Sequence, residues 1–287
     1  MRGPEDETRP HVSVICPFTG SDAALARIQA ALARIELRDG DEILIADNRR
    51  QGGGSDPTFG GGPDPSSLLN ILPAPGPPSS YFARDVAARA ATGEWLVFVD
   101  ADTDPAPDLL DAYFDPAPAD DVGVLAGAIE DVVVEDTLVA RYITARRKLD
   151  QTTTLDRERP YAQTANAAVR RAAFEAVGGW PEPIRSGGDA DLCWRLAAAG
   201  WRMEARPAAS VAHRNRAGLR DYLGQIHKHG AGMRWLDERW PGAFPAPTAR
   251  DLVGRLKLLT RDTPAFAALD VLGLYARDLG RLRRNQP

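Results

Sequence analysis

Cysteine is scarce in this chain of 287 residues, which contains only Cys16 and Cys193. Both lie among apolar neighbours, and two cysteines cannot form a disulfide framework. We therefore expect buried free thiols and a reducing compartment. The first ten residues, MRGPEDETRP, are polar and acidic, unlike a secretory signal peptide. Together these features predict a cytoplasmic protein.

Long apolar runs and a surplus of positive charge are also missing. No uninterrupted apolar stretch reaches the ~20 residues that a membrane-spanning helix needs. The formal net charge is −5, whereas a general nucleic-acid binder usually carries a basic surplus. Hydrophobic residues at 44% and charged residues at 26% are typical of a globular protein. The composition therefore excludes a membrane-spanning segment and predicts no nucleic-acid partner.

Apolar strands alternate with a helix in the first part of the chain. The run HVSVICPF (11–18) and the run DEILIAD (41–47) are typical of strands. Between them, Leu25, Ile28 and Leu32 recur at helical spacing. A strand–helix–strand order favours parallel pairing covered by helices. We therefore predict an α/β fold with a mostly parallel, Rossmann-like sheet flanked by helices.

The segment 49–67, RRQGGGSDPTFGGGPDPSS, is rich in Gly, Pro and Ser. Two GGG triplets without a helix or strand pattern indicate a long flexible loop. A phosphate-binding glycine loop is the alternative interpretation. It would require GxGxxG or GxxxxGK spacing, and neither is present. A flexible loop is the better prediction.

The rest of the chain continues the pattern, with glycines where helices should stop. A helix through SSYFARDVAARAATG is expected to have Gly93 as its C-cap, and later helices should end at Gly178–Gly179 and at Gly200. Further strands are expected at WLVFV, VGVLAGAI and RMEARPAASVAHR. Helices are expected near PDLLDAYF and around 136–150. We find no internal repeat.

The strand WLVFV (95–99) is followed at once by Asp100, Asp102 and Asp104. Ligands of open α/β sheets bind at the carboxyl ends of strands, so Asp100 and Asp102 should lie at the ligand edge. Two carboxylates one residue apart can face one hard divalent cation, which prefers oxygen ligands and often also binds substrate phosphates. The alternative is turn chemistry, in which Asp104 and Pro105 open the next helix.

Two later segments carry further candidate residues. In SGGDADLCWRL, Asp189 and Asp191 open a helix behind two glycines, and the alternative role of either is a helix N-cap. His213, one of four histidines, ends a strand-like segment. Alone it would be an ordinary surface or packed histidine. These residues become informative only together with the acids of the earlier strand.

In their order along the chain, these motifs resemble the family 2 glycosyltransferases of the GT-A fold. The matching segments are VSVICPF, ILIAD, YFARDVAARAATGEWLVFVDAD, TANAAVRRAAFEAVGGW, GGDADLCWRL and SVAHR. They extend from His11 to His213, roughly three quarters of the chain. The third segment is the most specific, because it joins an Arg-containing helix, a Thr-Gly-Glu turn, an apolar strand and DAD in one block. The resemblance implies a GT-A catalytic domain over 1–218.

The resemblance also implies a nucleotide pocket at the first strand ends. Pro17, Thr19 and Asp47 would line this pocket, with Asp47 receiving the base or the ribose. Arg84 would lie near the nucleotide. The chain departs from the family pattern here, because FTG stands where Thr-Tyr-Asn is usual after the first strand's proline, and Arg84-Asp85 stands where Arg-Asn is usual.

The acids after the 95–99 strand would bind the donor and its metal. Asp100 and Ala101 would contact the donor, with Asp100 on the ribose or uracil side. Asp102 would hold Mn²⁺ or Mg²⁺ on the diphosphate. His213 matches a histidine that completes the metal shell in some members of the family. The resemblance therefore implies a metal site made by Asp102 and His213.

The reaction itself would depend on the segment around Asp189. Asp189 matches the family's catalytic base. Asp191 and Arg195 would organise its helix, and Asn166 and Gly188 would support the acceptor side. Family members usually have Glu immediately before the base, whereas this chain has Gly188.

The implied activity is inverting transfer of a sugar from a nucleotide-sugar, most directly a UDP-sugar, to an acceptor hydroxyl. The acceptor would be a saccharide, a lipid-linked molecule or a small molecule. One alternative is a nucleotidyltransferase with a GT-A-like fold, which would need a Lys- or Arg-rich glycine loop that PFTGSDAALAR matches poorly. Another is a non-catalytic sugar-nucleotide-binding module, and the retention of Asp102, Asp189 and His213 together argues against it.

The C-terminal segment 219–287 differs in charge from the rest of the chain. It has 12 Lys and Arg against 7 Asp and Glu, so the other 218 residues carry −10. We expect a basic helical extension, including an amphipathic helix at DLVGRLKLLTR, that packs on the catalytic domain with solvated Arg faces. Peripheral contact with the inner membrane face and a homodimer contact are the alternatives. Without a Cys or carboxylate pattern nearby, His227 and His229 are interpreted as surface or acceptor-loop residues.

Overall fold

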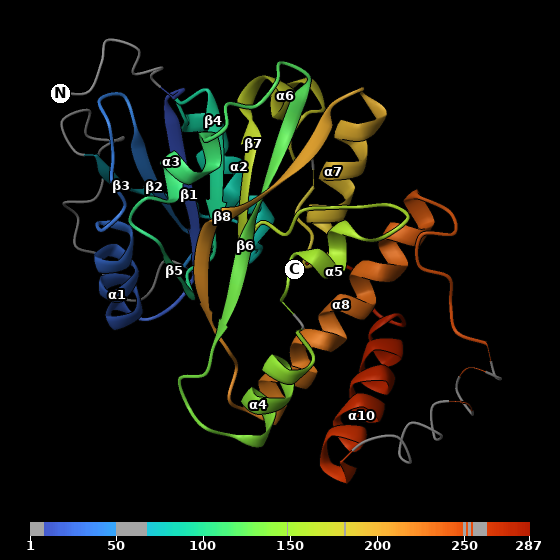
Figure 1. Ribbon diagram of the computed structural model, residues 1–287. Coiled ribbons are helices and arrows are strands. Elements are labelled where there is room, and N and C mark those ends of the chain that lie inside the picture. Colours follow the sequence, from blue (N-terminus) through green and yellow to red (C-terminus); the bar gives the residue numbers. More distant parts are fainter. Residues whose placement is uncertain are drawn as a thin grey trace.

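The computed structural model describes residues 9–49, 68–147, 149–180, 182–248, 251, 254 and 263–287. These residues form an eight-stranded sheet with helices on both faces (Figure 1). The strands, in their order across the sheet, are β3 (Leu69–Pro73), β2 (Glu42–Asp47), β1 (Val12–Phe18), β4 (Trp95–Val99), β7 (Asn166–Arg170), β6 (Val122–Val132), β8 (Arg202–Arg214) and β5 (Thr103–Pro105). The expected loop after Arg49 and most of the expected helix at DLVGRLKLLTR lie outside the described residues.

The sheet is parallel in its first half and mixed in its second. Strands β3, β2, β1 and β4 pair in parallel, and so do β6 and β8. Strand β7 runs antiparallel to both β4 and β6, and β5 runs antiparallel to β8. The predicted α/β fold is confirmed. Strand β7 was not predicted, because its short NAAVR run continues directly into a helix of similar composition.

The helices divide between the two faces of the sheet. Their bounds are α1 (Asp22–Leu32), α2 (Ser80–Ala90), α3 (Leu109–Phe114), α4 (Leu138–Ala145), α5 (Thr152–Leu155), α6 (Arg171–Ala176), α7 (Gly188–Ala198), α8 (Leu219–Arg239) and α10 (Pro264–Gly280). Helices α1 and α3 pack with Val14 and Val97 on one face, whereas α2, α6 and α7 pack with Leu44 and Phe98 on the other. Burial on both faces explains why the central strands are continuously apolar.

Glycine ends two of the expected helices but not the third. Gly178 and Gly200 adopt φ values of +78° and +93°, as expected after α6 and α7. The expectation for Gly93 is wrong, since α2 ends at Ala90 and is capped by Ala91. A Cβ at Gly93 would lie 2.5 Å from the backbone nitrogen of Ser13. This glycine therefore permits close packing against β1.

Helices α8 and α10 lie side by side beyond the end of β6 and β8 (Figure 1). Their backbones touch at two glycines: a Cβ on Gly230 would lie 1.9 Å from the carbonyl oxygen of Arg277, and one on Gly280 would lie 2.0 Å from that of His227. The segment predicted as a helical extension therefore contains two long helices, while residues 240–248 after α8 form turns and irregular structure. The domain boundary at residue 218 stays a prediction. None of the helices in the described part of the chain has both the length and the apolarity needed to cross a bilayer.

The glycine contact between α8 and α10 generates a test of this packing. Gly230→Ala should lower the free energy of unfolding by about 1–3 kcal/mol, because the two helices must separate to admit the methyl group. Gly224→Ala, on the same helix with no atom within 4 Å of the added Cβ, should instead raise it by about 0.5–1 kcal/mol. Denaturant unfolding of both variants measures the difference. Equal effects would contradict the close approach.

Candidate functional site

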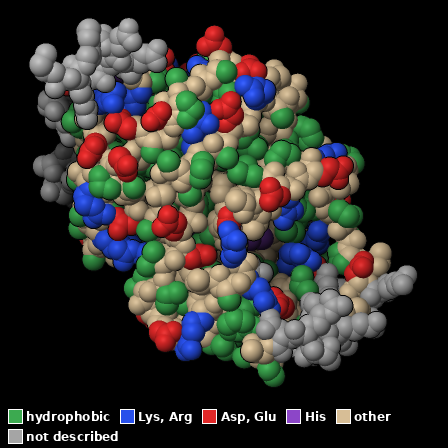
Figure 2. Space-filling model, in the orientation of Figure 1, with side chains coloured by type: hydrophobic (Ala, Val, Ile, Leu, Met, Phe, Trp, Pro, Cys, Tyr) green, Lys and Arg blue, Asp and Glu red, His purple; other side chains and the backbone are tan. Residues whose placement is uncertain are grey.

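A cavity of about 300 Å³ lies between the residues that follow β4 and one face of α8. Asp100, Asp102, Asp189 and His213 all line it, together with Arg84. Three separate parts of the sequence are thus brought to one place. In Figure 2, basic side chains surround a hollow near the middle of the displayed face. We call this space the first cavity.

Strand pairing brings His213 to the acids that follow β4. The short strand β5 pairs antiparallel with β8 and places Thr103 opposite His213. The backbone nitrogen of Arg214 also donates to the carbonyl oxygen of Asp102 at 3.0 Å. As a result, one ligand atom from each of Asp100, Asp102 and His213 lies within 4.8 Å of the others. These three residues form the metal trio.

Asp102 and His213 stabilise each other's charged forms. His213 Nε2 lies 3.4 Å from Asp102 Oδ1. Burial opposes ionisation of Asp102, but the hydrogen bond and charge of His213 outweigh it and lower the pKa of the carboxyl. Burial likewise opposes protonation of His213, yet Asp102 raises the pKa of the imidazole. Without a metal ion, Asp102 and His213 therefore favour a carboxylate–imidazolium pair, and a bound cation would take the place of the imidazole proton.

The donor set of the trio fits a divalent cation. Two carboxylates provide the oxygen ligands that Mn²⁺ and Mg²⁺ prefer, and the open side of the site leaves room for phosphate oxygens. His213 is almost fully buried, and its Nδ1 has no hydrogen-bond partner among the described residues. The residues that would hold the metal are therefore Asp100, Asp102 and His213.

Asp189 lies in the first turn of α7 and lines the first cavity together with the trio. Glycine 187, with φ +87°, is the N-cap of this helix, so neither Asp189 nor Asp191 caps it. The hydroxyl of Thr164 donates to Asp189 Oδ1 at 2.7 Å. Burial raises the pKa of Asp189, although Arg84 and the Thr164 hydrogen bond oppose the rise. A carboxylate with a raised pKa is a stronger base than an exposed one.

Arg84 connects the metal trio with Asp189. Its buried guanidinium donates to Asp100 Oδ1, and its charge also acts on Asp189. The guanidinium lies 5.4 Å from the ring centre of Tyr81, a contact typical of cation–π pairs. Arg84 therefore neutralises part of the negative charge that three neighbouring carboxylates create.

Tyr81 fills the space next to Gly188. A Cβ on Gly188 would lie 2.5 Å from Cε1 of the Tyr81 ring. The Glu that is usual before the base would therefore clash with this ring. Tyr81 also packs on Trp180, whose indole nitrogen donates to the Gly188 carbonyl at 3.0 Å. The departure from the family pattern at Gly188 is thus matched by an aromatic side chain from α2.

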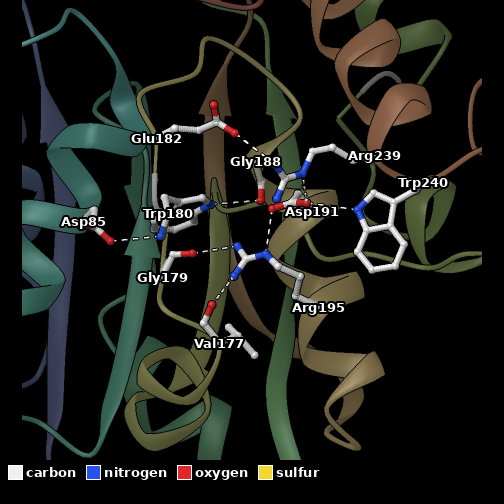
Figure 3. Close-up of polar contacts among 10 residues, drawn as sticks. All are labelled: Asp85, Val177, Gly179, Trp180, Glu182, Gly188, Asp191, Arg195, Arg239 and Trp240. Atoms are coloured by element: carbon white, nitrogen blue, oxygen red, sulfur yellow. Dashed lines mark hydrogen bonds and ion pairs between the residues drawn. The ribbon is translucent and has the colours of Figure 1, made fainter.

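Asp191, two residues after Asp189 on α7, is the centre of a buried polar network (Figure 3). Arg195 Nε donates to one carboxylate oxygen at 2.8 Å, and Arg239 Nε and Trp240 Nε1 each donate to the other at 3.1 Å. Arg195 further donates to the carbonyl groups of the 177–179 turn. The network joins α7 to α8 and to the turn after α6. Asp191 and Arg195 lie where they can fix the helix that carries Asp189.

The residues expected at the first strand ends do not line the first cavity. Pro17 is the penultimate residue of β1, Asp47 is the last residue of the neighbouring β2, and Thr19 is exposed just beyond β1. The carboxylate of Asp47 is occupied by Arg49, whose Nη2 lies 2.6 Å away. These three residues share the carboxyl edge of the sheet with Asp100. Their predicted contact with a nucleotide stays a prediction.

Two other candidates face the protein interior. Ala101 is half-buried and packs against the core on the α1 side. Asn166 is fully buried; its amide donates to the carbonyl groups of Ala128 and Ala209 at 2.8 Å each, and its oxygen accepts from Tyr113 at 2.7 Å. Asn166 therefore ties β7 to its neighbouring strands and does not contact the cavity.

Several residues of the site were not identified from the sequence. Thr164 and Tyr81 lie within quoted family segments, but no pattern assigned them a role. Arg185 and Arg216 line the first cavity, and neither forms an ion pair with a carboxylate in the described part of the chain. One face of α8 also lines this cavity, through Tyr222, Gln225, Ile226 and His229.

The expectation for His229 as a surface or loop residue is wrong. It lies on α8, is half-buried, and lines the first cavity. Burial, followed by the charges of Arg216 and Lys228, lowers the pKa of His229 to about 4. The imidazole is therefore neutral at pH 7, and its Nε2 lies 2.9 Å from Gln225 Nε2. Among the described residues, neither His227 nor His229 belongs to a group of three or more possible metal ligands.

Comparison with known sequences gives one family and distant relatives. The family described as Glycosyl transferase family group 2 matches residues 95–272. Pre-mycofactocin glycosyltransferase of Mycobacterium tuberculosis is 29% identical over 252 residues, which cover 84% of this chain and 50% of that protein. Glycosyltransferase AglE of Haloferax volcanii is 26% identical over 199 residues, which cover 68% of this chain and 64% of that protein. The chain spans about half the length of the M. tuberculosis relative.

Comparison with solved structures supports the fold. The mannosyltransferase PcManGT of Pyrobaculum calidifontis, in complex with GDP-Man and Mn²⁺, matches with a TM-score of 0.60 at 19% identity, covering 96% of this chain and 74% of that one. GalNAc-T7 with UDP, GalNAc and Mn²⁺ matches with a TM-score of 0.56 at 13% identity, covering 94% and 55%. The predicted GT-A fold is therefore confirmed.

The network around Asp191 generates a stability prediction. Asp191→Ala should lower the free energy of unfolding by about 3–5 kcal/mol, because two arginines lose a buried partner. Glu238→Ala removes the exposed partner of Arg234 and should cost less than about 1 kcal/mol. Denaturant unfolding compares the two variants. A loss at Asp191 no larger than that at Glu238 would contradict the role given to the network.

Proposed function

We propose, from the fact that the chain belongs to glycosyl transferase family group 2, that this glycosyltransferase is metal-dependent and inverts the anomeric centre. It would move a sugar from a nucleotide-sugar, with UDP as the expected nucleotide, to an acceptor hydroxyl. One observation supports this most directly: the metal trio and Asp189 line the same cavity. Family membership favours glycosyl transfer over the nucleotidyltransferase and non-catalytic alternatives.

The first cavity has the charges that a sugar diphosphate requires. Asp100, Asp102 and His213 would hold Mn²⁺ or Mg²⁺, and a bound cation stabilises the negative charge that develops on a leaving diphosphate. Arg185 and Arg216 line the same cavity and can bind the phosphate oxygens that the cation does not reach. Arg84 holds Asp100 in place through its hydrogen bond.

Asp189 acts as the general base in this proposal. Its carboxylate accepts the proton of the acceptor hydroxyl while the oxygen attacks the anomeric carbon and the bond to the diphosphate breaks. A single displacement inverts the configuration at that carbon. Thr164 orients the carboxylate by its hydrogen bond, and burial keeps the base poorly solvated. In this proposal the reacting carbon would lie between Asp189 and the metal trio, which line the same cavity.

The proposal also includes the donor nucleotide, the cellular location and the oligomeric state. The two structural neighbours contain GDP-Man and UDP, so the choice of UDP rests on the family resemblance. A cytoplasmic location, peripheral contact with the inner membrane face and a homodimer stay predictions. The first relative is named for pre-mycofactocin; a saccharide, a lipid-linked molecule and a small molecule are the acceptor classes to test.

Substitution of the two key carboxylates should separate their roles. Asp102→Ala should weaken metal-dependent UDP binding by about tenfold or more, because the cation loses a ligand. Asp189→Asn should leave this binding nearly intact but reduce kcat by about 10²–10⁴-fold. Calorimetry with UDP or GDP, with and without Mn²⁺, measures binding.

The stability of the Asp189 variant provides a control for folding. Burial raises the pKa of Asp189 in the folded protein above its value in the unfolded chain. At any pH above the unfolded-state pKa, the ionised carboxylate therefore lowers the stability of the fold. Asp189→Asn removes this cost and should have a Tm no lower than that of the wild type. Equal losses of nucleotide binding in the Asp102 and Asp189 variants, or no loss in either, would contradict the assignment of a metal ligand and a base.

The pH dependence of transfer should report the environment of Asp189. Because the base works only when ionised, kcat/KM should fall as the pH drops through the raised pKa of Asp189. Thr164→Val removes a hydrogen bond that favours the charged form, so the acid limb should move to higher pH. Thr153→Val, which removes an exposed hydroxyl on α5, should leave the profile unchanged. If the acid limb of the kcat/KM profile does not move in Thr164→Val, Asp189 is not the base.

A further inference from the structure

A second cavity adjoins the first and shares Asp189 with it. It has a volume of about 140 Å³. Residues that line both cavities are Tyr81, Gln163, Ser186, Asp189 and His229. None of the metal trio lines the second cavity. Asp189 therefore stands between a space with cation ligands and a space without them.

The second cavity differs from the first in its chemistry. Its own walls are Tyr161, Met233, Leu236 and Phe244, with backbone from Gly187 and Gly232. Among the described residues, no Lys or Arg lines it, whereas three arginines line the first cavity. His229 at the junction is neutral at pH 7, since its pKa is lowered to about 4. A ligand with a phosphate or carboxylate would find no cation here.

The second cavity has room for one ring. An apolar cavity of about 150 Å³ accommodates one benzene ring, and the volume here is close to that. Aromatic side chains border it: Tyr81, Tyr161 and Phe244. Such walls favour a flat ring that can stack or meet their edges. The space therefore suits a single uncharged ring with a polar group directed at Asp189.

The walls are held by close contacts between backbones. Gly187 has φ +87°, and a Cβ there would lie 3.0 Å from Leu236 Cδ1. A Cβ on Gly232 would lie 2.8 Å from Ser186. These glycines allow α8 to approach the loop before α7, so the cavity is formed without a ligand. The hydrogen bond from Arg239 of α8 to Asp191 of α7 also holds these two helices together.

We propose that the second cavity receives the acceptor, and that this acceptor is an alcohol or phenol on one uncharged aromatic ring. The inference rests on the proposed function. The acceptor O–H gives its proton to the Asp189 carboxylate, and its oxygen forms the bond to the anomeric carbon of the donor. The bond from that carbon to the diphosphate breaks, and its electron pair leaves on the nucleoside diphosphate.

Fluorine NMR titration with para-fluorobenzyl alcohol tests the proposal directly. Wild-type protein should bind this probe at least about tenfold more tightly than methyl glucoside or benzyl phosphate, compared by competition. Met233→Trp should fill the cavity and weaken the probe by about tenfold or more. Leu282→Trp, at a position 76% exposed, should leave the affinity unchanged. Phe244→Ala, which removes one aromatic wall without adding bulk, should also weaken the probe.

Nucleotide binding, measured on the same samples, separates the two proposals. UDP or GDP with Mn²⁺ should bind wild type, Met233→Trp and Phe244→Ala within about twofold of each other, which also shows that the variants are folded. The acceptor proposal is overturned if the probe does not bind, if methyl glucoside or benzyl phosphate binds more tightly, or if both cavity variants keep full probe affinity. Loss of metal-dependent nucleotide binding in wild type would instead overturn the proposed function.

Discussion

The position of the site depends on one buried carboxylate, that of Asp191. Arg195, Arg239 and the indole of Trp240 converge on its two oxygens. Buried charge persists only where partners of this kind replace the lost water. Because Asp191 lies two residues beyond Asp189 on α7, the contacts that satisfy it also hold Asp189 and the end of α8. A network whose members line neither cavity thus supports the two helices that do.

Local patterns in the sequence were sufficient to predict the strands β1, β2, β4, β6 and β8 and the candidate acids. Asp100 and Asp102 follow an apolar strand, and parallel strands end at a common edge, so their place could be inferred without coordinates. His213 is different. Its approach to Asp102 depends on β5, a strand of three residues that no periodicity reveals, and only the family resemblance connected the two.

The parts that were missed are tertiary. The face of α8 that lines the cavities has helical spacing through Gln225, His229 and Met233, but periodicity cannot tell which surface a helix covers. The ring of Tyr81 fills the volume beside Gly188 from a helix more than a hundred residues earlier. The matched motif predicts Asn166 as a site residue, yet its amide donates both of its hydrogen bonds to backbone carbonyl groups of the sheet. These contacts join residues far apart in the chain, so local sequence patterns cannot predict them.

One helix, α8, forms a wall of both cavities and is backed by α10 through bare backbone contacts. A molecule that binds in one cavity and shifts or rigidifies α8 changes the free energy of binding in the other cavity. Thermodynamic linkage makes that influence equal in both directions. Ligands in the two cavities could therefore bind cooperatively through α8 alone, without a mobile lid. The size of this cooperativity would depend on how rigidly α10 holds α8.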